Sequence, residues 1–157
     1  MTTLMDLKAC EEAVRWAAKY DSFEAAWAEC ERGDWMLWLA AKAPLCSRQD
    51  LVLAACACAR LSLKYVKAGE KRPRVAIETA EAWARGDATL DRVRVAAYAS
   101  SYASSYASAA SSAAYAAAYA AYAAAHASSA SSAAARTSTL KQCADIVRAI
   151  VIPGRTR

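Results

Sequence analysis

The residues of this sequence best suited to chemistry are one histidine and six cysteines. His126 is the only histidine, and no acidic residue or cysteine lies near it in the sequence to orient it as a general base. Cys56 and Cys58 are two positions apart, which on a helix separates their thiols by about 200° and keeps both from facing one metal ion. The sequence also lacks the phosphate-loop, dinucleotide-binding and hydrolase motifs. We therefore expect no catalytic residue, no metal site and no cofactor.

The cysteines lie at positions 10, 30, 46, 56, 58 and 143. Asp6 and Lys8 interrupt the first ten residues, which lack the apolar stretch of a secretory signal. We therefore expect a cytoplasmic, reducing environment in which the thiols serve as small core residues. No run of about 20 strongly apolar residues predicts a membrane span.

A basic cluster is a second candidate site. Its members are Arg60, Lys64, Lys67, Lys71, Arg72 and Arg74. Such a cluster can contact phosphate groups, but it is also typical of the solvated end of a helix. The net charge is +5, with 15 basic and 14 acidic residues in 1–94 and 5 and 1 in 95–157. Because neither part is strongly basic, binding of a nucleic acid or nucleotide by this cluster is an alternative function and not the favoured one.

Aromatic residues are the candidates for contact with a protein partner. Trp35, Trp38 and Leu39 are spaced i, i+3, i+4, so they can share one helical face, and Asp34 precedes them. Tryptophan and tyrosine dominate binding hot spots because each buries a large area with little loss of rotamer entropy. Packing in the core is the favoured use of the same rings, and partner contact is the alternative.

Residues 95–135 are a low-complexity tract of alanine, serine and tyrosine without any charge. One aromatic stripe holds Tyr98, Tyr102 and Tyr106, and a second holds Tyr115, Tyr119, Tyr122 and His126. The two stripes point about 130° apart on one helix, so a break near residues 108–112 is favoured, giving two helices or a helical hairpin, with one long helix as the alternative. We expect Tyr98, Tyr102, Tyr106, Tyr115 and Tyr119 to be available for partner contact or self-association. Packing on the bundle and the binding of ice or another surface by an Ala-rich helix are the alternatives.

Composition favours an all-α fold. Glycine (4) and proline (3) are scarce while alanine is abundant, and no segment alternates like a strand. We expect one domain over residues 1–157, a bundle of about six or seven helices. Its parts are a helical core in 1–94, the tract in 95–135 and a C-terminal helix in 136–152 that packs on the core.

Capping residues predict the helix boundaries. The expected helices span residues 6–20, 22–33, 35–43, 47–69, 73–86, a sixth from about 89 into the tract, and one from about 137 to 152. Asp6, Ser22 and Asp34 are the expected N-caps of the first three, and Thr137 or Ser138 that of the last. Gly33 and Gly86 precede aspartates and suit the left-handed position after a helix, so a faint duplication of helical hairpins is an alternative to ordinary stop–start chemistry.

The fourth helix has the clearest signals. The run from Ser47 to Asp50 forms a variant capping box, and residues 51–59 carry no polar side chain apart from thiols. A helix that is apolar on all sides is expected to be the central, buried one. Pro73 suits the first turn of the fifth helix, where its missing N–H leaves no bond unmade.

Seven segments together carry a resemblance to a known family: residues 9–13 (ACEEA), 20–27 (YDSFEAAW), 30–39 (CERGDWMLWL), 51–60 (LVLAACACAR), 72–74 (RPR), 77–83 (IETAEAW) and 143–148 (CADIVR). They resemble the immunity-protein-five-like family of bacterial immunity proteins associated with polymorphic toxin systems. The resemblance implies an all-α protein that neutralises a cognate toxin by stoichiometric binding. Inhibitors of basic nuclease toxins are commonly acidic, whereas this chain has a net charge of +5. The toxin is therefore expected either not to be a basic nuclease or to dock on the locally acidic N-terminal third of this chain.

Overall fold

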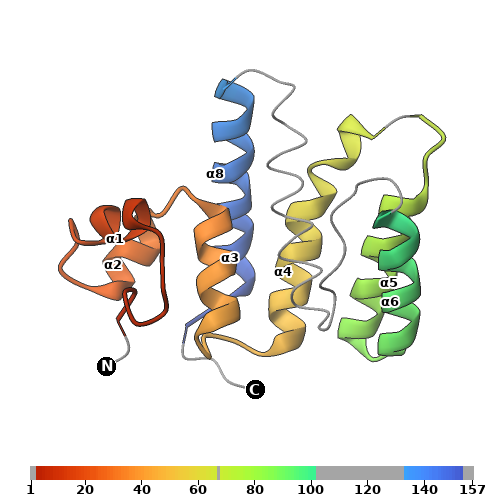
Figure 1. Ribbon diagram of the computed structural model, residues 1–157, viewed down its shortest axis with the longest axis horizontal. Coiled ribbons are helices and arrows are strands. Elements are labelled where there is room, and N and C mark those ends of the chain that lie inside the picture. The colour runs from red at the N-terminus through yellow and green to blue at the C-terminus, as the bar shows by residue number, and fades with distance from the viewer. Residues whose placement is uncertain (1–2, 67, 102–132, 154–157) are drawn as a thin grey trace.

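The computed structural model describes residues 3–66, 68–101 and 133–153, and these residues form helices and turns without any strand (Figure 1). The α-helices are α1 (Glu11–Ala17), α2 (Phe23–Glu29), α3 (Gly33–Lys42), α4 (Arg48–Arg60), α5 (Arg72–Arg85), α6 (Leu90–Ser101) and α8 (Ala133–Ile150), and a 3-10 turn, η1, spans Leu63–Tyr65. The expected all-α fold is confirmed. None of the described helices has the length and apolarity that a membrane crossing requires.

The helices are arranged around α4 (Figure 1). On one side α4 packs against α8 and α3, and on the other against the hairpin of α5 and α6. The short helices α1 and α2 lie outside α3, at the opposite end of the molecule from α5 and α6 (Figure 1). The C-terminal helix α8 therefore packs against α3 and α4.

The central position of α4 follows from its sequence. The Ser47 side chain accepts a hydrogen bond of 3.0 Å from the Asp50 amide, which confirms the predicted cap. Most of residues 51–59 are buried, in two separate apolar clusters. Cys56 faces the cluster with α5 and α6 while Cys58 faces the cluster with α3 and α8, so the two thiols do point to opposite sides. The helix ends at Arg60 and not near residue 69.

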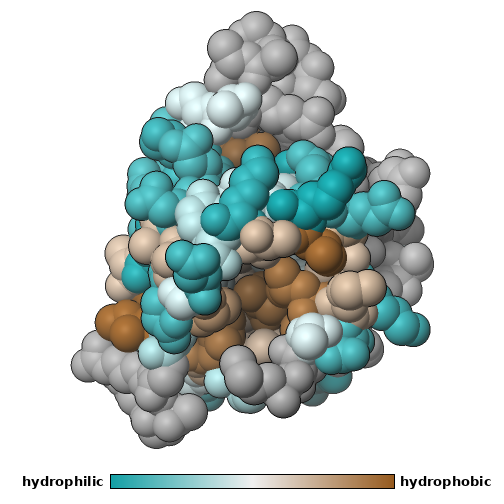
Figure 2. Space-filling view, turned by 90° about the vertical axis from the view of Figure 1, so that its left-hand side faces the viewer, coloured by the Kyte–Doolittle hydropathy of each residue, from teal (hydrophilic) through white to brown (hydrophobic). Residues whose placement is uncertain are grey.

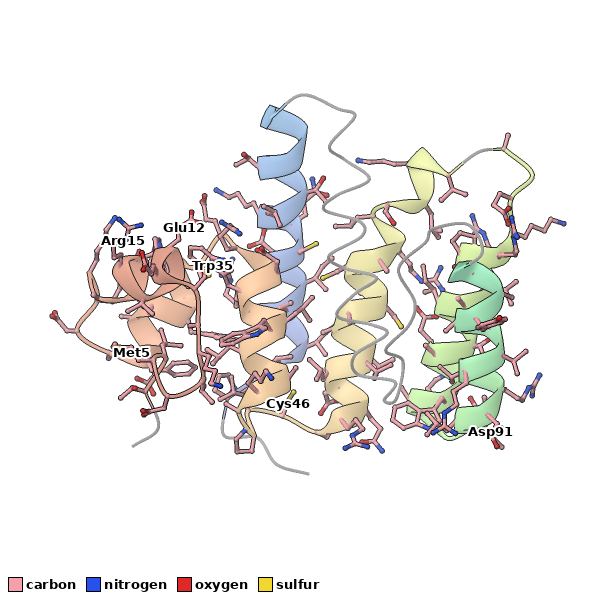
Figure 3. All side chains as sticks on the ribbon, viewed as in Figure 1. Met5, Glu12, Arg15, Trp35, Cys46 and Asp91 are labelled. Atoms are coloured by element: carbon pink, nitrogen blue, oxygen red, sulfur yellow. The ribbon has the colours of Figure 1, made fainter. Side chains whose placement is uncertain are left out.

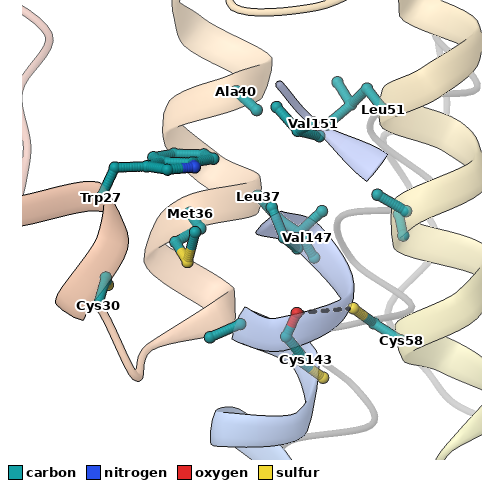
Figure 4. Close-up of a cluster of buried hydrophobic side chains, with 13 residues drawn as sticks. Trp27, Cys30, Met36, Leu37, Ala40, Leu51, Cys58, Cys143, Val147 and Val151 are labelled. Atoms are coloured by element: carbon teal, nitrogen blue, oxygen red, sulfur yellow. Dashed lines mark hydrogen bonds between the residues drawn. The ribbon is translucent and has the colours of Figure 1, made fainter. Parts of the chain in front are cut away.

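The larger cluster joins α2, α3, α4 and α8 (Figure 4). Its fully enclosed side chains include Met36, Leu37, Val147 and Val151. Trp27 of α2 reaches toward α3 above Met36 and is 9% exposed, so it anchors α2 to this core (Figure 4). At about 25 cal/mol per Å² of apolar surface, a ring of this size makes the largest single contribution to holding α2 in place.

The first helix is shorter than predicted. It begins at Glu11, because residues 4–8 form a turn in which Lys8 has a left-handed backbone (φ 60°). Asp6 is not a helix cap; its carboxylate accepts hydrogen bonds of 2.8 Å from both the amide and the hydroxyl of Thr3. These hydrogen bonds favour the charged carboxylate and lower the pKa of Asp6. By contrast, Ser22 caps α2 as predicted, accepting from the Ala25 amide at 3.1 Å.

The two Gly-Asp junctions differ in structure. Gly86 has φ 88° after α5, as predicted, and Thr89 accepts a hydrogen bond at 3.4 Å from the Arg92 amide at the start of α6. Gly33 was expected in the same conformation, but it is the first residue of α3 and is buried. Asp34 consequently lies inside the first turn of α3 and does not cap it. The similar sequences at the two Gly-Asp junctions therefore do not form two equivalent helical hairpins.

Two later boundaries also differ from prediction. After α4 the Ser62 hydroxyl donates to the Ala59 carbonyl at 2.6 Å and the Ser62 amide bonds the same carbonyl, which tightens the chain into η1. The last helix begins at Ala133, so Thr137 and Ser138 lie within α8 and not at its N-cap. Residues 95–101 of the tract extend α6, and residues 102–132, which include the expected break near 108–112, lie outside the described residues.

The six cysteines are free thiols in very different surroundings. Cys10 is exposed, Cys46 is half-buried, and the other four are buried. Burial raises the pKa of Cys56 to about 12, and the hydrogen bond with the Cys143 thiol together with burial raises the pKa of Cys58. The hydrogen bond with the Cys58 thiol instead lowers the pKa of Cys143. Because the thiolate is the reactive form, Cys56 and Cys58 are protected both sterically and chemically, while Cys143 is protected by its burial.

Ellman's reagent is therefore expected to react rapidly with one thiol of the folded protein, that of Cys10, and more slowly with Cys46. The remaining four should react only after unfolding in denaturant, because they are buried and the reagent cannot reach them. The time course of absorbance measures this, and Cys10→Ser should remove the rapid phase alone. Rapid reaction of three or more thiols without denaturant would contradict the buried positions.

Candidate functional site: an aromatic and cationic surface at the N-terminal end

A stack of rings and one arginine joins α1 to the start of α3. Trp35 lies 6.0 Å from Trp16, centroid to centroid, in an edge-on arrangement, and Trp16 lies 4.8 Å from Tyr20. The Arg32 guanidinium lies 4.2 Å from the centroid of the Trp35 ring, within cation–π range. All four side chains are partly buried, so each supports its neighbour and still offers an edge to solvent.

Carboxylates fix the arginine of this stack. Asp34 holds Arg32 through two hydrogen bonds, 2.9 Å from Nε and 2.7 Å from Nη2, and Glu12 of α1 accepts from Nη1 at 3.4 Å. The hydrogen bonds with Asp34 raise the pKa of Arg32 above its usual value. The fork geometry of the guanidinium leaves its flat face on the Trp35 ring, which makes the group rigid and amphipathic. Figure 3 shows Glu12 and Trp35 on this upper side of α1 and α3.

A second aromatic contact lies on α2. The Phe23 ring is 5.7 Å from the Trp27 ring and is 39% exposed, and Met5, in the turn before α1, is 72% exposed. Figure 2 looks onto the side of the molecule that carries α1 and α2, where apolar side chains gather in a hollow below a hydrophilic rim. The surface formed by Met5, Phe23 and the Arg32 stack is called the N-terminal surface below.

The structure assembles only part of the predicted partner site. Trp35 and Asp34 both belong to the N-terminal surface, while Trp38 is partly buried on the next turn of α3. Tyr98 is 63% exposed on α6, at the other end of the row of helices (Figure 1). The other predicted tyrosines, Tyr102, Tyr106, Tyr115 and Tyr119, lie outside the described residues, as does His126.

Sequence reasoning missed three members of the stack: Trp16, Tyr20 and Arg32. Trp16 and Tyr20 are four positions apart, so the predicted helix over residues 6–20 would place both rings on one face. Arg32 gave no such signal, because it was predicted in a different helix from Trp35 and in the structure it precedes the first residue of α3. The contact between Trp16 and Trp35 had no such signal, because it depends on how α1 folds back on α3.

Acidic partners occupy part of the basic cluster. Arg60 donates to both carboxylate oxygens of Glu81, at 2.8 and 2.7 Å, and this pairing lowers the pKa of Glu81. Arg72 pairs with Glu70 and holds the pKa of that carboxyl at about 2. Lys71 and Arg74 are exposed near the start of α5, Lys64 is exposed in η1, and Lys67 lies outside the described residues. Binding of phosphate by the cluster stays a prediction, and Arg60 and Arg72 already have carboxylate partners.

The described residues also set limits on metal chemistry. Within residues 3–66, 68–101 and 133–153 no group of three histidine, cysteine or acidic side chains is placed to hold a metal ion. What the N-terminal surface offers is rigid rings, one fixed cation and exposed apolar side chains. Such an arrangement can bind another macromolecule by shape and burial.

Comparison with known proteins gives the family. Residues 44–146, about two-thirds of the chain, match the family described as "Imm-5 like putative immunity protein". The matched segment starts just before α4, so the resembling segments at 9–13, 20–27 and 30–39 lie ahead of it. No curated protein and no solved structure matches the chain. On the strength of a match that spans α4, α5, α6 and the first part of α8, the chain belongs to the Imm-5-like family of immunity proteins.

Proposed function

We propose that this protein neutralises a cognate toxin by binding it directly in a fixed stoichiometry, without catalysing a reaction. The observation that carries the proposal is the Arg32–Trp35–Trp16 stack. Tryptophan, tyrosine and arginine are the residue types enriched in binding hot spots, and here they are half-exposed and held rigid before any partner arrives. Membership in the Imm-5-like family supports a toxin as the class of partner.

Preorganisation makes the stack suited to tight binding. Association loses side-chain entropy for each flexible group that becomes ordered, about 0.5–1.5 kcal/mol per long side chain. Arg32 is already ordered by Asp34 and by the Trp35 ring, so little of this loss remains to be incurred. The free thiols fit action in a reducing compartment, and we infer that the complex forms in the cytoplasm.

The proposal predicts rescue of growth. A toxin encoded beside the gene should stop growth when expressed alone, and co-expression of this protein should restore growth and yield a co-purifying complex. Trp16→Ala should weaken the complex at least about tenfold, because it removes a ring that supports the stack. Binding is measured by calorimetry on variants whose melting temperature shows that they are folded.

Tyr98→Ala is the matched control for the surface. It also removes one partly exposed ring, but from α6 at the far end of the molecule. Loss of affinity with Tyr98→Ala and not with Trp16→Ala would transfer the binding role to the tract predicted from the sequence. Absence of both rescue and co-purification would refute neutralisation by direct binding.

A further inference from the structure

The N-terminal surface lies on short helices with few buried residues and carries two large exposed apolar side chains. Helix α1 has no fully buried residue, and α2 has one, Trp27. Phe23 and Met5 nevertheless remain exposed by 39% and 72%. The contact of Phe23 with the Trp27 ring holds it in place, so it stands as a fixed apolar projection and not as a flexible side chain.

The charge around this surface differs in sign from the rest of the chain. Residues 1–43 hold 8 acidic and 5 basic side chains, whereas residues 44–157 hold 7 and 15. Asp21 and Glu24 flank Phe23 and are exposed, and no ion pair of the described residues involves either of them. The one cation of the stack, Arg32, is already balanced by Asp34 and Glu12.

We propose that the N-terminal surface docks a protein with a cationic surface, in which basic side chains face Asp21 and Glu24 and an apolar side chain covers Phe23. This inference rests on the proposed function and names the chemistry of the toxin. An acidic surface repels nucleic acid and anionic lipid, which excludes both as occupants. It also repels an identical copy of itself, so a symmetric dimer through this surface is disfavoured.

The acidic side chains Asp21 and Glu24 act mainly on the rate of association. Complementary charges steer the encounter of two proteins, while desolvated apolar contacts determine how long the complex lasts. The overall charge of +5 would by itself slow the approach of a cationic partner. A locally acidic face at one end of the molecule overcomes this by orienting the partner toward that end. At 0.1 M salt this electrostatic attraction extends about 10 Å, because salt screens it at longer distances.

Reversing the charge of Asp21 and Glu24 tests their role in association. The probe is the inactivated toxin that co-expression has shown this protein to neutralise, and stopped-flow or surface plasmon resonance measures its association rate. The double variant Asp21→Lys with Glu24→Lys should associate at least about tenfold more slowly at low salt, and its rate should depend less on salt than that of the parent. Phe23→Ala should instead leave association unchanged and speed dissociation about tenfold.

A matched control carries the same change of charge at the other end. Glu78→Lys with Asp91→Lys alters exposed carboxylates of α5 and α6, and Figure 3 shows Asp91 far from α1. This control should bind the toxin within about twofold of the parent. If the two double variants and Phe23→Ala all bind like the parent, the inference is overturned while the proposed function stands. If the parent itself fails to bind the toxin, the proposed function has failed first.

Size-exclusion chromatography with light scattering tests the remaining occupant. The protein alone should be a monomer at micromolar concentration, because its acidic surface has no complementary copy of itself. A dimer that the Asp21→Lys and Glu24→Lys changes dissociate would show that a second copy covers the surface, and this would also overturn the inference.

Discussion

Replacing Gly33 with alanine is expected to lower the free energy of unfolding by about 3 kcal/mol, because the new methyl group has no space. A Cβ at this position would lie 2.4 Å from the Cys143 Cβ, 2.6 Å from the Ala144 nitrogen and 2.7 Å from the Cys143 carbonyl carbon. Two of these three atoms belong to the backbone of α8, so a change of rotamer cannot relieve the clash. Helices α3 and α8 must separate, and the main cluster between them must loosen.

The matched control is the same substitution at Gly86. That glycine has φ 88°, and a methyl group added to it would meet no atom within 4 Å, so Gly86→Ala should cost only the backbone strain, about 1 kcal/mol. Urea denaturation of both variants and the parent measures the difference. Equal losses for the two variants would mean that α3 and α8 do not approach as closely as described, and that Gly33 is only a helix start.

The contrast between these glycines shows how far local sequence can predict this fold. Both precede aspartate, and the left-handed conformation predicted for both is found at Gly86 alone. At Gly33 the deciding interaction is with Cys143 and Ala144, about 110 residues further along the chain. Glycine suits both a left-handed turn and a close contact between helices, so the neighbouring sequence could not distinguish these two roles.

Helix α4 was predictable because its signals are local. Its capping residue, Ser47, is three positions before the Asp50 amide that it bonds. Residues 51–59 are apolar on all sides of the helix, so they must be buried whatever packs around them. The opposite directions of Cys56 and Cys58 follow from helical geometry alone. The early start of α8 was missed because alanine and serine before Thr137 give no capping signal that competes with a continuing helix.

The candidate site was predictable only in part for a related reason. Asp34 and Trp35 were identified from residue type and spacing within one segment. Their partners Trp16 and Glu12 come from α1, and the association of α1 with α3 depends on the path of the chain through residues 18–32. Composition indicated that rings would be used for binding, but only the fold shows which rings meet.

Replacing Arg148 is expected to release α2 from the core. Its Nη1 donates to the Cys30 carbonyl at 2.6 Å and to the Trp27 carbonyl at 3.3 Å, and Nη2 bonds Asp145 of α8 at 2.6 Å. The two carbonyls are at the C-terminal end of α2, where no further amide of the helix can reach them. A cation there satisfies both carbonyls and opposes the negative end of the helix.

Arg148→Ala should therefore lower the free energy of unfolding by about 2–3 kcal/mol, the value of hydrogen bonds from a charged donor. Arg148→Lys should recover part of this loss, because an ammonium group keeps the charge but not the fork that reaches α2 and Asp145 together. Arg92→Ala, an exposed arginine of α6, is the matched control and should stay within about 0.5 kcal/mol of the parent.

Hydrogen exchange distinguishes a local release from general loosening. In Arg148→Ala the amides of α2 should exchange much faster than in the parent, while those of α4 should change only by the loss of global stability. Because Phe23 and Trp27 are on α2, the same variant should also weaken toxin binding, although Arg148 is itself partly buried and lies behind the surface. Uniform acceleration in α2 and α4 would mean that Arg148 stabilises the core as a whole, and that α2 is held by the Trp27 ring alone.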